Sequence, residues 1–421
     1  MTAPLDIPAQ LREMGRAARE AAGTLRLASS ETRAGAIRAM ADRLRADESA
    51  ILEANARDLE AGRAKGLSGA MLDRLTLDTT RIDGIADSLD RIAALPDPLN
   101  RELDSWTQPN GLAFSKVTVP IGVIGMIYES RPNVTADAGA LCVKSGNAVI
   151  LRSGSEALAS SLAIHAALAK GLADAGLPES VVQLVPFTDR AAVGEMLAGA
   201  GEAIDLIIPR GGKGLVERVQ SEAKVPVLAH LDGLNTTYIH ASADADMAIE
   251  VVLNAKMRRT GICGATETVL VDAGAEALLP RLVSALQEAG CEVRGDARVA
   301  RLTGAKAATP EDFRTEHLAP VVNMAVVDDL GAALAHIGQH GSGHTDAIIA
   351  EDASAASRFL QSVDSAIVMH NASTQFADGG EFGFGAEIGI STGRLHARGP
   401  VGAQHLVTHK YIVRGQGTVR P

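Results

Sequence analysis

The chain has 421 residues, which suggests two or three domains at about 100–200 residues per domain. Its 40 basic and 51 acidic residues give a net charge of −11, so the basic footprint of a nucleic-acid-binding protein is missing and an anionic membrane surface would not attract it. Hydrophobic residues make up 46% of the chain and charged residues 22%, a balance that argues against intrinsic disorder.

The cysteines Cys142, Cys263 and Cys291 are far apart and form no CxxC pair. This spacing argues against thiolate zinc sites and against a disulfide framework, and it fits a reducing compartment. The N-terminal segment has no apolar signal region, and the most apolar run, residues 117–128, is too short for a membrane span. We therefore expect a soluble, cytoplasmic protein with no membrane partner.

The first part of the chain has apolar residues at helical spacing. Helices are expected at residues 17–27, 32–45, 48–63 and 69–95. The Pro-Asn-Gly turn that follows lies between two extended pieces and predicts a β-hairpin over residues 106–119. A tail segment, residues 405–415, also alternates like a strand.

From residue 121 onward, short apolar strands alternate with helices, a pattern typical of parallel strands joined by crossover helices. Strands are expected at residues 121–128, 148–151, 181–185, 204–208, 225–229, 238–240, 268–271, 322–327, 346–350 and 366–369. The predicted fold class is therefore α/β, with two parallel-sheet domains and a β-arm. Because ligands of open parallel sheets bind at the carboxyl ends of strands, we expect the functional loops to follow strands.

Neither a GxGxxG turn after the first strand nor a Walker A sequence is present. Two strand–turn–helix segments, residues 148–160 and 204–218, nevertheless present helix N-termini that would suit a pyrophosphate. Ordinary βα turns are the alternative interpretation, because glycines are common in such turns.

Cys263 lies in the segment RRTGICGATE, between Gly261 and Gly264. Flanking glycines leave a thiol accessible, and the nearby Arg258 and Arg259 would favour its thiolate form. Packing in the core is the alternative for a single cysteine. We interpret Cys142 and Cys291 as structural.

Three histidines, His336, His340 and His344, follow one another at intervals of four residues. Glycines among them are expected to end the helix near His340, and no acidic ligand set accompanies them. We therefore expect no metal site. His344 and Thr345 are instead expected in a Gly-rich loop that contacts the substrate.

Four segments together resemble the γ-glutamyl phosphate reductase (glutamate-5-semialdehyde dehydrogenase) family of the aldehyde dehydrogenase superfamily. They are residues 120–157 (PIGVIGMIYESRPNVTADAGALCVKSGNAVILRSGSEA), 327–348 (VDDLGAALAHIGQHGSGHTDAI), 384–402 (FGAEIGISTGRLHARGPVG) and the surroundings of Cys263. The resemblance covers nearly the whole chain in the right order.

The resemblance implies an aldehyde-dehydrogenase-like fold. It places an NADP-binding domain at residues 1–237, to which residues 365–400 return, and a catalytic domain at residues 238–364. The hairpin 106–119 and residues 401–421 would form an oligomerisation arm.

The implied reaction is the NADPH-dependent reduction of the small molecule L-glutamyl 5-phosphate to L-glutamate 5-semialdehyde and phosphate through a cysteine thioester. This reaction is the second step of proline biosynthesis from glutamate. A homo-oligomer, and functional coupling to glutamate 5-kinase, are also implied. The alternatives are a non-catalytic nucleotide-binding paralogue, which the intact Cys263 disfavours, and a hydrolytic aldehyde dehydrogenase.

By resemblance, Cys263 is the nucleophile and the amide of Asn133 an oxyanion donor. Glu316 matches the glutamate that holds the nicotinamide ribose. The expected cofactor contacts are Arg152, Ser153, Ser155, Gly211 and Gly212, and the expected substrate contacts are Arg131, His344 and Thr345. Hydrolytic members of the superfamily have a water-activating glutamate in a Glu-Leu-Gly-Gly segment, whereas the matching stretch here is His230-Leu231-Asp232-Gly233.

Overall fold

The computed structural model describes residues 6–420 and consists of two compact units. Within the described residues, unit 1 comprises the chain up to Ala229, Gly383–Gly389 and the chain from Val401 onward. Unit 2 comprises His230–Phe382 and Ile390–Pro400. None of the helices that the structure describes combines the length and apolarity needed to cross a membrane.

These boundaries differ from the predicted ones at 237, 364 and 400. Two strands explain the difference: β7 (Asn235–Ile239) and β13 (Ile367–His370) each pair with β12 (Thr345–Ile349) in the sheet of unit 2. Of the predicted returning segment 365–400, only Gly383–Gly389 joins unit 1. Sheet pairing, which local sequence pattern does not reveal, decides where the division lies.

The N-terminal helices of unit 1 begin where short polar side chains cap them. Asp6, Ser29 and Asp78 each accept a hydrogen bond from a first-turn backbone amide of the helix that follows. The cap at Asp78 divides the predicted helix 69–95 into two. The helices are α1 (Ile7–Leu27), α2 (Ser30–Ala46), α3 (Glu48–Ala64), α4 (Gly69–Leu75) and α5 (Thr79–Ala94).

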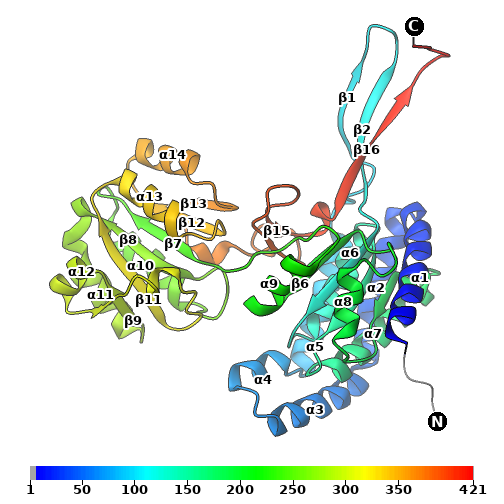
Figure 1. Ribbon diagram of the computed structural model, residues 1–421, viewed down its shortest axis with the longest axis horizontal. Helices are drawn as coiled ribbons and strands as arrows, with labels where there is room; N and C mark the ends of the chain where they lie inside the picture. The colour runs from blue at the N-terminus through cyan, green and yellow to red at the C-terminus, as the bar shows by residue number, and fades with distance from the viewer. Residues whose placement is uncertain (1–5, 421) are drawn as a thin grey trace. The chain divides into compact units, whose positions relative to one another are not determined.

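A parallel four-stranded sheet forms the centre of unit 1, in the order β5-β4-β3-β6. Its strands are β3 (Val123–Tyr128), β4 (Ala148–Ser153), β5 (Val182–Leu184) and β6 (Leu206–Arg210). The accompanying helices are α6 (Asn133–Lys144), α7 (Leu158–Asp174), α8 (Ala191–Leu197) and α9 (Lys213–Glu222). One core cluster joins α1, α8 and α9 to this sheet, while α2, α3 and α5 contact α6 or α7 (Figure 1).

The strand predicted at residues 225–229 does not form. A single parallel bridge joins Ile207 to Val227, and the carbonyl oxygen of Pro226 accepts the Ile207 N–H. Pro226 has no N–H to donate, so the ladder cannot extend through it.

The arm is an antiparallel three-stranded sheet in the order β1-β2-β16 (Figure 1). Its strands are β1 (Glu102–Thr107), β2 (Ala113–Pro120) and β16 (Val407–Arg414). The predicted hairpin and the predicted tail strand therefore pair with each other within one chain, from Val407 opposite Pro120 to Arg414 opposite Ala113. The chain just before β16 belongs to the body of unit 1, because Leu406 is buried there and its carbonyl accepts the amide of Asn147.

Unit 2 is built on a parallel seven-stranded sheet in the order β10-β9-β11-β8-β7-β12-β13. The strands not yet given are β8 (Thr266–Asp272), β9 (Glu292–Gly295), β10 (Lys306–Ala307) and β11 (Val321–Val327). Its helices are α10 (Ala245–Met257), α11 (Leu279–Glu288), α12 (Ala297–Thr303), α13 (Leu330–His340) and α14 (Ala353–Ser362). Alternate residues of β8 face opposite layers: Val269 and Val271 pack with α10, α11 and α12, and Leu270 packs with α13 and α14.

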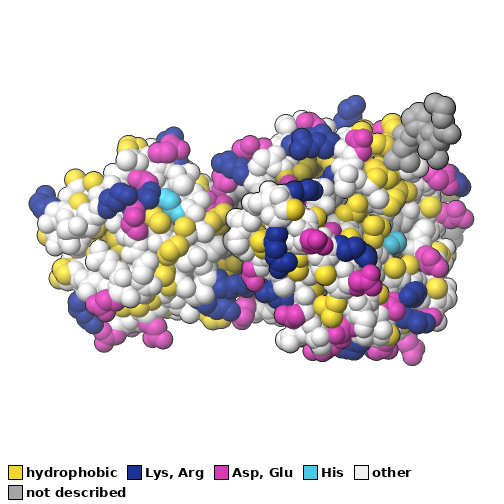
Figure 2. Space-filling view, turned by 90° about the horizontal axis from the view of Figure 1, so that it is seen from below, with side chains coloured by type: hydrophobic (Ala, Val, Ile, Leu, Met, Phe, Trp, Pro, Cys, Tyr) yellow, Lys and Arg dark blue, Asp and Glu magenta, His cyan; other side chains and the backbone are white. Residues whose placement is uncertain are grey.

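Figure 2 shows basic and acidic side chains interspersed over the face in view, without a continuous basic stripe on that face.

Candidate active site

Three adjacent strands of unit 2 begin beside one another, in the order β8-β7-β12. Cys263 lies in the loop that leads into β8, His230 in the segment before β7, and His344 immediately before β12. Parallel strands all start at the same edge of their sheet, so the three side chains gather there. The cluster thus lies at the amino ends of these strands, whereas the sequence pattern predicts functional loops at the carboxyl ends.

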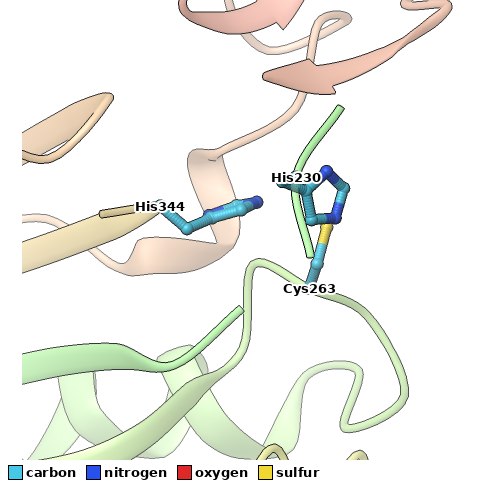
Figure 3. A group of neighbouring side chains, drawn as sticks. All are labelled: His230, Cys263 and His344. Carbon is cyan, nitrogen blue, oxygen red and sulfur yellow. The ribbon is translucent and has the colours of Figure 1, made fainter. Parts of the chain in front are cut away.

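The three side chains point toward one another (Figure 3). A ring nitrogen of each histidine and the Sγ of Cys263 all lie within 4.8 Å of one another. Cys263 and His230 are half-buried, whereas His344 is 1% exposed. A thiol flanked by two imidazoles has bases available for proton transfer, and the same atoms could also hold a thiophilic metal.

Hydrogen bonds orient both imidazoles. Nδ1 of His230 lies 2.9 Å from the carbonyl oxygen of Ile390, and Nδ1 of His344 lies 2.9 Å from the hydroxyl of Thr345. The Nε2 atom of His344 is buried and has no hydrogen-bond partner among the residues that the structure describes. His344 therefore offers this nitrogen to the space beside the thiol.

His344 lies in the predicted Gly-rich loop, and Thr345 begins the strand that follows it. Thr345 is completely buried as the first residue of β12, and its backbone N–H donates to the side chain of Asn235. Its hydroxyl orients His344. The contact of Thr345 with the substrate stays a prediction.

The loop that carries Cys263 is held by the segment before β7. The side-chain amide of Asn235 donates to the carbonyl of Cys263 at 2.7 Å. The N–H of Gly233 donates to a carboxylate oxygen of Glu316 at 3.0 Å. One oxygen of the predicted ribose-binding carboxylate is thus bonded to the backbone beside the thiol, and the ribose contact itself stays a prediction.

The other two thiols lie away from this site and are buried. Burial raises the pKa of the Cys142 thiol far above its usual range, and it raises the pKa of Cys291 to about 11. Both therefore remain protonated near neutral pH. The exposed Arg258 and Arg259 lie at the end of α10, and the groups gathered around the Cys263 sulfur are histidines.

Three of the predicted cofactor contacts lie in unit 1 at the carboxyl end of β4: Arg152 and Ser153 end the strand, and Ser155 lies in the turn that follows. Arg152 is half-buried, and its guanidinium donates to the carbonyls of Ser153 and Thr188. Burial lowers the pKa of Arg152, and its Nε has no partner among the described residues. Ser153 is buried, with its hydroxyl against the carbonyl of Gly154, whereas Ser155 is exposed.

The strand order of unit 1 reverses between β3 and β6, which is where ligands of open α/β sheets bind. Gly211 and Gly212 follow β6 at this point. The N–H of Gly212 donates to the carboxylate of Glu129 at 3.0 Å, and a Cβ at Gly211 would meet the same carboxylate. The Glu129 carboxylate therefore accepts from the Gly212 N–H, a donor that the sequence predicts to contact a cofactor phosphate.

Asn133 begins α6 and donates its side-chain amide to Asp137 at 2.9 Å. It lines a hollow of about 390 Å³ in unit 1 together with Arg74, Thr76, Leu77, Arg81, Gly84, Ile85, Ser88, Arg91 and Asp137. Arg131 and Asn133 also line a smaller hollow of about 40 Å³. The arginines make the larger hollow suited to an anionic small molecule.

Comparisons with known proteins identify the family. The profile of the aldehyde dehydrogenase family matches residues 1–300. A γ-glutamyl phosphate reductase from Caulobacter vibrioides is 61% identical over 97% of this chain and 99% of its own length. Another, from Sphingopyxis alaskensis, is 61% identical over 99% of this chain and 97% of its own length. The crystal structure of γ-glutamyl phosphate reductase from Thermotoga maritima has a TM-score of 0.95 and 42% identity over 98% of this chain and 100% of that one.

The chain belongs to the γ-glutamyl phosphate reductase family. The predicted resemblance, the aldehyde-dehydrogenase-like α/β fold and the assignment to an oxidoreductase are confirmed.

His230 is the residue of this γ-glutamyl phosphate reductase site that the sequence analysis did not predict. The sequence comparison used it only as the position where hydrolytic relatives have a glutamate. That substitution was itself the available signal, because a residue in the place of a catalytic base is expected near the thiol. The structure places it there.

Proposed function

We propose that this chain catalyses the NADPH-dependent reduction of L-glutamyl 5-phosphate to L-glutamate 5-semialdehyde and phosphate, through a thioester on Cys263. The observation that carries the proposal is the half-buried thiol of Cys263 between the imidazoles of His230 and His344. Membership of the family supports the reductase activity, and the position of Cys263 supports its role as the nucleophile.

The first step uses the thiolate of Cys263. Its sulfur forms a bond to the acyl carbon, and the bond from that carbon to the phosphate oxygen breaks, so that phosphate leaves with the electron pair. An imidazole beside the sulfur can hold the thiol proton before the attack. The backbone N–H of Cys263 and the amide of Asn133 are proposed as donors to the oxyanion.

A bound NADPH would supply a hydride to the carbonyl carbon of the thioester. The resulting tetrahedral oxyanion on Cys263 would then break its carbon–sulfur bond, which releases the aldehyde and regenerates the thiolate. The chain must bind the cofactor and exclude water during these steps. His230 in place of a water-activating glutamate supports this assignment, because a reductase must keep water from hydrolysing its thioester.

The residues of unit 1 fit a phosphate-bearing cofactor. Arg152 is a half-buried cation at the carboxyl end of β4, and its buried Nε lacks a partner among the described residues. Ser153, Ser155, Gly211 and Gly212 would complete the cofactor contacts, and Glu316 would hold the ribose. Arg131, His344 and Thr345 remain proposed contacts of the substrate.

The substrate and product also suggest the place of the reaction. An acyl phosphate must be made by a kinase that phosphorylates a carboxylate, here glutamate 5-kinase, and it is lost to water unless it is used promptly. Functional coupling to that kinase, and a place as the second step of proline biosynthesis from glutamate, are therefore proposed.

The test is the reverse reaction: reduction of NADP by glutamate 5-semialdehyde, which must depend on added phosphate. Cys263→Ser should lose at least roughly 1,000-fold in turnover, because an alcohol is a far weaker nucleophile. Cys142→Ser and Cys291→Ser, the matched controls, should retain activity. Full activity of Cys263→Ser, or phosphate-independent reduction that yields glutamate, would contradict the proposal.

A further inference from the structure

We infer that His230, Cys263 and His344 form a binding site for a thiophilic divalent cation of the Zn²⁺ class, and that the bound cation blocks the nucleophile. The proposed reduction needs no metal, so a cation bound to these side chains would compete with the reaction and take no part in it.

The geometry needs only a small contraction to hold such an ion. The three ligand atoms lie within 4.8 Å of one another. In a tetrahedral zinc site, Zn–N and Zn–S bonds place neighbouring ligand atoms about 3.3–3.6 Å apart. Approach by about an ångström, which side-chain rotation in a half-buried loop can provide, brings Cys263 and His230 into that range.

The hydrogen bonds of both imidazoles prepare them for this role. Ligating histidines usually donate their second ring N–H to a carbonyl or hydroxyl, which leaves the other nitrogen unprotonated. Here Nδ1 of His230 bonds the carbonyl of Ile390, and Nδ1 of His344 bonds the hydroxyl of Thr345. The carbonyl accepts from Nδ1 of His230, which leaves Nε2 of that ring with a lone pair. The Thr345 hydroxyl can likewise accept from Nδ1 of His344, whose Nε2 is buried without a partner among the described residues.

The donor set selects the class of ion. One sulfur and two imidazole nitrogens suit Zn²⁺, Co²⁺ or Cd²⁺, whereas Mg²⁺ and Ca²⁺ require oxygen ligands. Three protein ligands leave the fourth position of a tetrahedral ion for water.

The consequence for activity rests on the proposed function. A sulfur that donates its electron pair to Zn²⁺ cannot attack an acyl carbon, so the bound ion inhibits until a chelator removes it. Binding itself does not depend on the proposed function and can be measured alone.

A second histidine pair provides the matched control. His336 and His340 lie one turn apart on α13, with ring centroids 4.5 Å apart. Among the residues that the structure describes, no cysteine forms a potential metal-binding group with them. A metal that binds there would have imidazole ligands without a thiolate. The double variant His336→Ala/His340→Ala should therefore leave the proposed site intact.

The experiment titrates the full chain with Co²⁺ and follows the near-ultraviolet thiolate-to-cobalt charge-transfer band, then displaces Co²⁺ with Zn²⁺. We expect one equivalent to produce the band in the wild type and in His336→Ala/His340→Ala. Cys263→Ser should lose the band, and His230→Asn and His344→Asn should each weaken binding roughly tenfold or more. Circular dichroism melting checks that each variant folds.

Zn²⁺ should also abolish the reverse reaction, and a chelator should restore it. Absence of the band in the wild type, or its persistence in Cys263→Ser, overturns the inferred site. A band that depends on Cys263, together with full activity of the Zn²⁺-loaded protein, upholds the site and contradicts the nucleophile role of Cys263 instead.

Discussion

Gly233 lies against the backbone of Cys263: a Cβ built at Gly233 would come within 2.2 Å of the Cys263 carbonyl oxygen. The same carbonyl accepts the amide of Asn235, and the Gly233 N–H bonds Glu316. The segment before β7 thus packs directly against the loop that carries the thiol and fixes its position, and no side chain fits between them.

Gly233→Ala should therefore impair turnover. A methyl group would push the Cys263 loop away, and a displacement near 1 Å at a reacting atom costs roughly 100-fold in rate. The measurement is kcat in the reverse reaction, with circular dichroism to establish that the sheet of unit 2 still forms.

Gly338→Ala is the control for that substitution. Gly338 is exposed in the interior of α13, and a Cβ there would meet nothing within 4 Å. Alanine should stabilise this helix by about 1 kcal/mol and leave kcat unchanged. Equal activity in Gly233→Ala and Gly338→Ala would show that the close approach has no role in placing the thiol.

Arg152 is expected to favour NADPH over NADH. A charge-assisted bond to a 2′-phosphate contributes about 1.5–3 kcal/mol, so Arg152→Ala should raise the Michaelis constant for NADPH roughly 10- to 100-fold. The constant for NADH should change much less, and this comparison controls for the lost bonds to Ser153 and Thr188. Equal effects on both cofactors would remove the proposed 2′-phosphate contact.

Glu156 provides the opposite test. Its carboxylate accepts the N–H and the hydroxyl of Ser130, and a Cβ at Gly154 would meet it at 2.1 Å, so it lies over the turn that follows β4. A carboxylate there would repel a 2′-phosphate. Glu156→Gln should lower the Michaelis constant for NADPH, while an unchanged constant would place the phosphate elsewhere.

Asp346 should make the stability of the protein depend on pH. Burial raises its pKa from 3.8 to about 6, although its oxygens accept bonds from Thr236 and Ser365. The folded state holds this proton more tightly than the unfolded state. Protonated Asp346 therefore contributes its full share to the free energy of unfolding below about pH 4, and this share is lost as the pH rises through about 6. The loss amounts to about 3 kcal/mol, from a shift of about two pKa units.

Urea unfolding at a series of pH values measures this effect. Asp346→Asn should remove the decline in unfolding free energy between about pH 4 and 6. Asp352 is the control, because backbone N–H groups of Ala355 and Ser354 lower its pKa. Asp352→Asn should alter the slope in the opposite sense. If Asp346→Asn and the wild type show the same dependence of unfolding free energy on pH, Asp346 is not the group responsible.

The arm is predicted to hold a homo-oligomer together. Trp106 stacks on Phe114 at 5.2 Å and meets the ring of Tyr411 at 6.1 Å, yet Trp106 is 37% and Tyr411 55% exposed. An aromatic cluster on a three-stranded sheet with two open edges is suited to pairing with a second copy.

Light scattering tests the arm. The full chain should have a mass that is a multiple of 43.6 kDa, and Trp106→Lys/Tyr411→Lys should reduce it to one chain. Leu27→Lys, at a residue that is 80% exposed at the end of α1, should leave the mass unchanged. A full chain that is monomeric at micromolar concentration would rule out this role.

Local signals in the sequence were sufficient for most elements of the fold. The Pro-Asn-Gly turn predicted the β1–β2 hairpin, and helical spacing predicted α3 to within one residue of its observed end. The glycines around Cys263 marked the accessible thiol. These features depend on dihedral preferences and side-chain periodicity within a few residues, so they can be read without knowing which strands are neighbours.

Only the tertiary structure decided the composition of the candidate site. His230, Cys263 and His344 are distant in the chain and converge because β7, β8 and β12 are neighbours in one sheet and begin at one edge. Long-range strand order also moved the boundary of unit 2 to His230 and brought β13 into its sheet. Strand order is set by packing between distant segments, and a local pattern carries no information about which segments those are.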